Sequence, residues 1–83
     1  MADEKKEIAY DAELDTRGLF CPEPIFEVRT FSESLDIGQI FKVLADDPAA
    51  EEDLKRWGKR TGTELLELVK DEDDLIFYFK KKK

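Results

Sequence analysis

Two proline-marked helix starts, at residues 22–24 and at Pro48, divide this 83-residue chain into alternating strand and helix patterns. Proline suits the first turn of a helix, because the amide hydrogen that it lacks would have had no intrahelical partner there. Each start follows a short apolar stretch with the two-residue period of a strand. The chain is long enough for one compact domain and too short for two, so these elements share one core.

The first strand is expected from residue 8 to Asp15, where apolar side chains alternate with polar or small ones. A turn at residues 16–18 follows it. Beyond the turn, apolar residues recur at helical spacing: Ile25, Val28, Phe31 and Leu35. We therefore expect a helix with Cys21 as its N-cap and Pro22 as its first residue, which ends by Gly38.

The second half of the chain predicts a strand, a helix and a hairpin. The strand covers residues 40–45, with Phe41, Val43 and Ala45 on one side. The helix follows Asp46-Asp47, begins at Pro48 and stops at Gly62, and four of its residues share a face: Ala50, Leu54, Trp57 and Thr61. Residues 64–70 and 75–80 form the hairpin, joined by an acidic loop at residues 71–74.

This order of elements, βαβαββ, predicts an α/β (α+β) two-layer sandwich. Right-handed crossovers place both helices on one face of a four-stranded mixed sheet. Residues 1–7 are almost all charged or small and are expected to form a flexible leader to a single domain at residues 8–83. The basic run at residues 80–83 is expected to be a solvated, frayed end.

Composition excludes several kinds of site. One cysteine and no histidine exclude an internal disulfide, a Cys/His zinc site and a Cys-His catalytic pair within one chain. The net charge of −7 disfavours direct binding of nucleic acid. Asp46 and Asp47 are interpreted as a helix cap, so no metal or cofactor is expected.

Hydropathy and the amino-terminal residues predict the cellular location. No apolar run reaches the length of a membrane span, and the first fifteen residues are too acidic and polar for a secretory signal. We therefore expect a cytoplasmic protein that does not act in a membrane and whose thiol stays reduced.

The cysteine is the candidate reactive group. A helix start lowers the pKa of a thiol, because free amides and a partial positive charge lie beside the sulfur. Arg17 could add a full positive charge, whereas Asp15 and Glu23 would oppose it; alternatively, Asp15 could hold Arg17. The structural alternative is that Cys21 is a small buried apolar residue.

Residues 14–24 read Leu-Asp-Thr-Arg-Gly-Leu-Phe-Cys-Pro-Glu-Pro. This stretch closely resembles the signature of the TusA/SirA-like sulfur-carrier family, whose hallmark is Cys-Pro-x-Pro after Leu-Asp-x-Arg-Gly-Leu. The resemblance continues to Leu35 and Gly38, through residues 45–48 to Trp57, and into residues 62–66. One departure is Thr63, where many members carry histidine.

The resemblance implies the βαβαββ fold and a sulfurtransferase role in which Cys21 carries sulfur as a persulfide. Asp15, Arg17, Pro22 and Pro24 would support that cysteine, the prolines by fixing a rigid helix start. It also implies a donor protein, such as a cysteine desulfurase or rhodanese, and an acceptor protein.

The acceptor stays open at this point: tRNA thiolation, molybdenum-cofactor synthesis and sulfur oxidation all fit the resemblance, and related proteins are linked to selenium. Two functions of other classes also stay open. One is a protein-interaction or regulatory module that does not use the thiol. The other is a one-cysteine redox sensor, which would need an external thiol to resolve its sulfenic acid.

Overall fold

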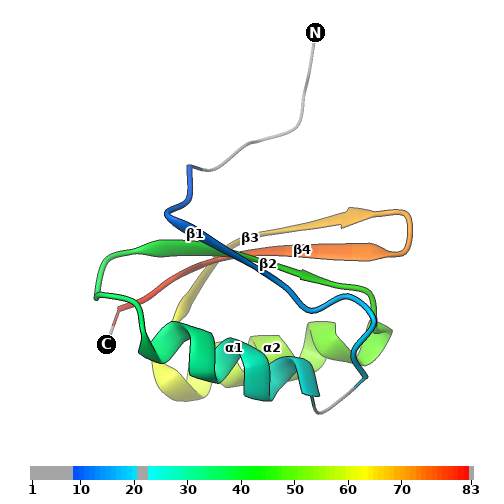
Figure 1. Ribbon diagram of the computed structural model, residues 1–83, viewed down its shortest axis with the longest axis horizontal. Coiled ribbons are helices and arrows are strands. Elements are labelled where there is room, and N and C mark those ends of the chain that lie inside the picture. Colours follow the sequence, from blue (N-terminus) through cyan, green and yellow to red (C-terminus); the bar gives the residue numbers. More distant parts are fainter. Residues whose placement is uncertain (1–8, 21–22, 83) are drawn as a thin grey trace, which may run out of the picture.

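A four-stranded sheet carries both helices on one of its faces in the computed structural model, which describes residues 9–20 and 23–82 (Figure 1). The elements in chain order are β1 (Ala12–Asp15), α1 (Glu23–Glu33), β2 (Ile40–Ala45), α2 (Pro48–Thr61), β3 (Glu64–Asp71) and β4 (Asp74–Lys80). The strand order is β1-β2-β4-β3, with β1 parallel to β2 and β4 antiparallel to both of its neighbours. The predicted two-layer βαβαββ sandwich with a mixed sheet is therefore confirmed.

Some predictions fall on residues that are not described. The leader at residues 1–7, the N-cap role of Cys21 and the helix start at Pro22 all lie outside the described residues, as does Lys83. Within the described ranges, neither helix has the length and apolar character needed to cross a membrane.

The core lies between the helices and the two central strands. Across β2 and β4, Phe41 pairs with Phe79 and Val43 with Phe77, and all four side chains are buried on the helical side. Trp57 of α2 meets Phe79 edge-on, with ring centroids 5.7 Å apart. Because full burial of one such side chain stabilises a fold by about 1.5–3 kcal/mol, this aromatic layer is a main source of the stability that holds α2 on the sheet.

Strand β1 is shorter than the sequence pattern predicts, since it begins at Ala12. Its parallel partner β2 begins at Ile40, so residues 9–11 have no strand beside them to extend the ladder. At Asp11 the carboxylate accepts a hydrogen bond from the Ile40 amide at 2.9 Å, while the Asp11 amide donates to the Ile40 carbonyl at 2.7 Å. The Asp11 carboxylate thus accepts the hydrogen bond of the Ile40 amide, which a backbone carbonyl would accept if the β1–β2 ladder continued.

Helix α1 ends at Glu33, and Leu35 lies beyond it, contrary to the helical position expected for that residue. The amides of Ser34 and Leu35 donate to carbonyls only three residues back, at 3.2 and 3.1 Å, which tightens the chain out of the α-helix. Gly38, with φ of 97°, belongs to the turn that leads into β2.

Helix α2 has the caps that the sequence predicts. Asp47 is the N-cap and its side chain accepts from the Ala49 amide at 3.1 Å, Pro48 is the first helical residue, and Gly62 is the left-handed C-cap with φ of 78°. Ala50, Leu54 and Trp57 are buried as expected. Thr61 is exposed, because it lies in the last turn of α2, where the helix leaves the core.

The prediction of a frayed basic end is wrong for its first two residues. Lys80 is the last residue of β4, and Lys81 is fixed against α1. The Lys81 ammonium donates to the carbonyls of Ser32 and Leu35 at 2.6 and 2.9 Å. Carbonyls at a helix C-terminus have no intrahelical partners and attract a cation, so Lys81 serves as a side-chain cap for α1.

Candidate functional site

The loop that leads to Cys21 begins at Thr16, directly after β1. Thr16 is 1% exposed, and both its amide and its hydroxyl donate to the Leu44 carbonyl of β2, at 2.7 and 2.6 Å. The Leu19 amide then donates to the Thr16 carbonyl at 3.2 Å and closes a turn. The loop is therefore anchored to the sheet at its first residue.

Arg17 is held by carboxylates on two elements. Its guanidinium donates to both carboxylate oxygens of Asp15, through Nε at 3.0 Å and through a terminal nitrogen at 2.9 Å, and its amide donates to the same side chain at 3.0 Å. A weaker contact of 3.4 Å reaches Asp74 at the start of β4. The hydrogen bonds with Arg17 hold the pKa of Asp15 below its ordinary value of 3.8, and those with Asp15 raise the pKa of Arg17.

These contacts bear on one of the two sequence-based expectations for Arg17. The notion that Asp15 holds Arg17 is confirmed, and both side chains are almost half exposed. An exposed pair of this kind contributes little to the free energy of unfolding. The bidentate geometry instead fixes the direction of the loop at Arg17.

Gly18 joins the loop to the start of α2. With φ of 90° it adopts a left-handed conformation that glycine tolerates best, and its amide donates to the Asp46 carboxylate at 3.0 Å. Sequence reasoning placed Asp46 in the cap of α2 and missed this contact, which joins residues 28 apart in the chain. In the described part of the chain, no three Asp or Glu residues are grouped so as to hold a metal ion.

The chain on either side of residues 21–22 is also fastened. The Glu23 amide donates to the Phe20 carbonyl at 2.8 Å, and Pro24 in the first turn of α1 is less than 2% exposed. Pro24 thus fixes the start of α1 against the core. Cys21 and Pro22 themselves lie outside the described residues.

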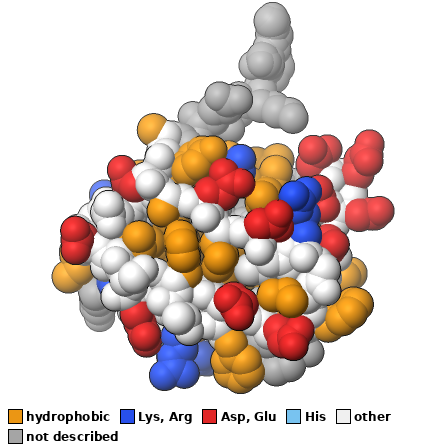
Figure 2. Space-filling model, viewed as in Figure 1, with side chains coloured by type: hydrophobic (Ala, Val, Ile, Leu, Met, Phe, Trp, Pro, Cys, Tyr) orange, Lys and Arg blue, Asp and Glu red, His pale blue; other side chains and the backbone are white. Residues whose placement is uncertain are grey.

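The surface beside these residues is apolar at two points and acidic elsewhere. Phe20 is 73% exposed and Phe26 is 56% exposed, which is unusual for large aromatic side chains. Figure 2 shows carboxylates over much of the face that it draws, with a cluster at the upper right on the side of the β3–β4 turn, where residues 71–73 are exposed. Two exposed phenylalanines near the motif are suited to contact with another protein.

Comparisons with known proteins agree with the resemblance found in the sequence. The family model described as sulfurtransferase TusA matches residues 12–81. A protein from Archaeoglobus fulgidus is 45% identical over 64 residues, which are 77% of this chain and 83% of that protein. The sulfur carrier protein TusA of Allochromatium vinosum is 36% identical over 72 residues, 87% of this chain and 95% of its own length.

A solved structure agrees with the fold. The crystal structure of a SirA-like protein from Desulfitobacterium hafniense superposes with a TM-score of 0.74 and 20% identity, covering 88% of this chain and all of that one. At 20% identity, the superposition supports only the βαβαββ architecture.

Proposed function

This chain belongs to the TusA family, and from that membership we propose that it is a sulfur carrier whose Cys21 accepts sulfane sulfur as a persulfide and passes it to an acceptor protein. The observation that carries the proposal is the family match over residues 12–81, which includes the Cys-Pro-Glu-Pro sequence at residues 21–24. Relatives named as sulfur carriers cover nearly the whole chain.

The proposed transfer is an exchange between two sulfur atoms. The Cys21 thiolate attacks the outer sulfur of a donor persulfide, the bond between the two donor sulfurs breaks, and the donor leaves as a thiolate. Cys21 then carries the outer sulfur and its proton as a persulfide, so no external oxidant or reductant is consumed. Attack on that outer sulfur by an acceptor nucleophile restores the Cys21 thiolate.

The described residues support this proposal through the rigidity of the loop and the exposure around it. Contacts from Thr16, Arg17 and Gly18 fasten the loop to three strands and to the residue before the N-cap of α2. A reacting sulfur held on such a loop would be presented to a partner in one direction, which lowers the entropic cost of reaching the attack geometry. In this proposal Asp15 and Arg17 position the loop, while Pro22 and Pro24 fix the start of α1.

The partners in this proposal are proteins. A cysteine desulfurase or a rhodanese would supply the sulfur, and the exposed Phe20 lies beside Cys21 in the chain, where a docking protein would contact it. The acceptor would belong to tRNA thiolation, molybdenum-cofactor synthesis or sulfur oxidation. We propose a cytoplasmic location, where thiols stay reduced.

The experiment compares the wild-type protein with Cys21→Ser after incubation with a polysulfide, or with a cysteine desulfurase and cysteine. Intact-mass spectra of the wild type should show added sulfur that a reductant removes, and the serine variant should show none. The free energies of unfolding of the two proteins should differ by less than about 1 kcal/mol if the thiol is an exposed N-cap, since serine caps at least as well.

The same spectra separate the alternatives. A wild-type protein that gains no reducible sulfur from any donor contradicts the carrier role and favours an interaction module. Oxidation by peroxide without any gain of sulfur favours a redox sensor. A serine variant that transfers sulfur at the wild-type rate excludes Cys21 as the carrier.

A further inference from the structure

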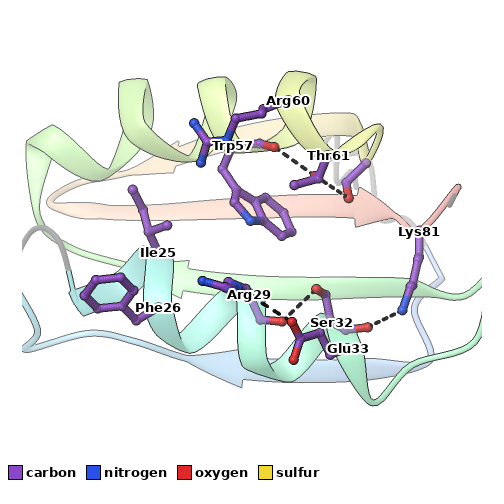
Figure 3. Close-up of a pocket in the computed structure, with 10 residues that line it drawn as sticks. Ile25, Phe26, Arg29, Ser32, Glu33, Trp57, Arg60, Thr61 and Lys81 are labelled. Atoms are coloured by element: carbon purple, nitrogen blue, oxygen red, sulfur yellow. Dashed lines mark hydrogen bonds and ion pairs between the residues drawn. The ribbon is translucent and has the colours of Figure 1, made fainter.

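A groove of about 430 Å³ opens between α1 and α2, on the helical side of the molecule (Figure 3). Its volume lies within the ~300–1,000 Å³ typical of sites for small molecules. Ile25, Phe26 and Arg29 line it from α1, and Trp57 and Arg60 line it from α2. The position is distinct from the loop at residues 16–20, none of which lines the groove.

The indole nitrogen of Trp57 is the unusual feature of this inter-helix groove. The Trp57 side chain is buried, with 3% of its surface exposed, and among the described residues its Nε1 has no hydrogen-bond partner. In Figure 3 the indole ring projects from α2 into the space between the helices, with its nitrogen toward α1. An indole N–H only donates, so a ligand that satisfies it brings an acceptor oxygen.

The charge of the groove favours an anion. Its lining residues include three cations and one carboxylate, in a chain whose net charge is −7. Arg29 pairs with Glu33 at 3.6 Å, and Lys81 is engaged with the carbonyls at the end of α1. The Arg60 guanidinium has no ion-pair or hydrogen-bond partner among the described residues, so it is available to a carboxylate.

Apart from Trp57, the apolar side chains of the groove are Ile25 and Phe26, beside the hydroxyl-bearing residues Ser32, Thr61 and Thr63. Ile25 is partly buried against the core, and Phe26 is more than half exposed. An inorganic oxyanion would leave these side chains unused, whereas an organic acid can place hydrocarbon on them. The indole nitrogen has almost no exposed surface in this structure, so an occupant reaches it only by moving a neighbouring side chain of the groove aside. A small molecule that enters the groove is better suited to this than the flat surface of a protein.

We propose that the inter-helix groove binds a small organic carboxylate. One carboxylate oxygen accepts from Trp57 Nε1–H, the charge is balanced by Arg60, and the apolar part of the ligand lies against Ile25 and Phe26. This site is separate from sulfur transfer, and the proposal does not depend on the chemistry of Cys21.

The test uses the single tryptophan of the chain as a reporter, because Trp57 gives the only indole N–H signal in a nitrogen–proton NMR spectrum of the full-length protein. Titration with phenylacetate should move this signal downfield along a saturable curve, since a hydrogen bond to a carboxylate deshields the proton. Phenylethanol, which lacks the charge, and sodium sulfate, which lacks the apolar part, should produce at most weak and non-saturating changes.

Two matched variants separate the proposed contact from a general effect of charge. Arg60→Gln should weaken phenylacetate binding by roughly threefold to tenfold, in line with the loss of one charge-assisted contact. Lys59→Gln removes the same charge from the neighbouring residue, which does not line the groove, and should bind as the wild type does. Both positions are exposed, so neither change disturbs the core.

Three results would overturn the proposal. They are an indole signal that does not respond to phenylacetate at tens of millimolar, an equal response to sulfate, and equal weakening by Arg60→Gln and Lys59→Gln. The first would indicate an indole N–H that organic carboxylates do not reach. The second and third would indicate nonspecific attraction of anions.

Discussion

The two carboxylate oxygens of Asp15 accept hydrogen bonds from the Arg17 guanidinium, at 3.0 Å from Nε and at 2.9 Å from a terminal nitrogen. The two residues lie on either side of the buried Thr16. A second carboxylate, Asp74, approaches the same guanidinium at 3.4 Å from the start of β4. The cation nearest to Cys21 in the sequence is therefore part of a local ion-pair network. Any effect of this network on the Cys21 thiol is a prediction, and it would include the charges of both carboxylates as well as that of Arg17.

The first prediction concerns the titration of Asp15. Because hydrogen bonds with Arg17 lower its pKa in the folded state, Asp15 stabilises the fold above its ordinary pKa of 3.8, and this stabilisation is lost as the pH falls through the lower folded-state value. Carbon-13 NMR of the carboxyl group should give a midpoint below 3.8 in the wild type. Arg17→Gln should return it toward 3.8, whereas Arg29→Gln should leave it in place. An unchanged midpoint in Arg17→Gln would show that the pair does not persist in solution.

The second prediction concerns the reactivity of Cys21. The alkylation rate should have its pH midpoint below the unperturbed thiol value of about 8.5, because a helix start favours the thiolate. Arg17→Gln removes a positive charge and should raise the midpoint, and Asp15→Asn removes a negative charge and should lower it. The double variant should return close to the wild type, since the two charges are removed together. A midpoint that is identical in all four proteins would exclude an electrostatic role for the pair.

The third prediction concerns Gly58 in the middle of α2. Glycine to alanine normally stabilises a helix by about 1 kcal/mol. Here an added Cβ would lie 2.9 Å from the Thr63 carbonyl oxygen and 3.4 Å from the Phe79 ring, so α2 would have to move away from the start of β3. Gly58→Ala should therefore destabilise the protein by about 1–3 kcal/mol in urea denaturation. Lys59→Ala, at an exposed neighbour, should change the stability by less than about 0.5 kcal/mol, and a stabilised Gly58→Ala would contradict the close packing.

Most of the fold could be predicted from the sequence, because its elements carry local signals. The bounds of β2 and the caps of α2 follow from an apolar alternation and from the sequence Asp47-Pro48, both of which act within a few residues. The predicted end of β1 at Asp15 is confirmed, whereas the start of β1 and the end of α1 could not be predicted in this way. They depend on where a partner strand begins and on Lys81, which reaches α1 from a distant part of the chain.

In the candidate site, too, features with a local sequence signal could be predicted, and contacts between distant parts of the chain could not. The candidate residues of the loop could be recognised in the sequence, as could the alternative that Asp15 holds Arg17. The contacts of Asp46 with Gly18 and of Asp74 with Arg17 join loops from different parts of the chain, and no local pattern indicates them. Trp57 is buried on the helix face that the sequence predicts, but the lack of a partner for its indole nitrogen among the described residues is visible only once the packing of the two helices is known.

The fourth prediction concerns Lys81, which binds the carbonyls of Ser32 and Leu35. Lys81→Ala should destabilise the protein by about 1 kcal/mol in thermal or urea denaturation, because two carbonyls at the end of α1 lose a charged donor. Lys82→Ala serves as the control. It removes only an exposed ion pair with Glu64 at 3.3 Å and should change the stability by less than about 0.5 kcal/mol. Equal effects of the two changes would contradict the capping role of Lys81.

The last prediction concerns Phe20, and this prediction rests on the proposed sulfur-carrier function. Its side chain is 73% exposed, so Phe20→Ala should change the stability by less than about 0.5 kcal/mol. If a donor protein covers this ring, the variant should need roughly fivefold to thirtyfold more of that protein for half-maximal transfer, as when a contact worth 1–2 kcal/mol is lost. Ile37→Ala is the matched control, since Ile37 is 68% exposed in the turn before β2 and should not affect transfer. Loading from a small polysulfide should be the same in all three proteins, because no protein surface has to dock. An unchanged requirement for the donor protein would place its docking site elsewhere, whereas a loss of polysulfide loading would show that Phe20 shapes the thiol's surroundings instead of a partner contact.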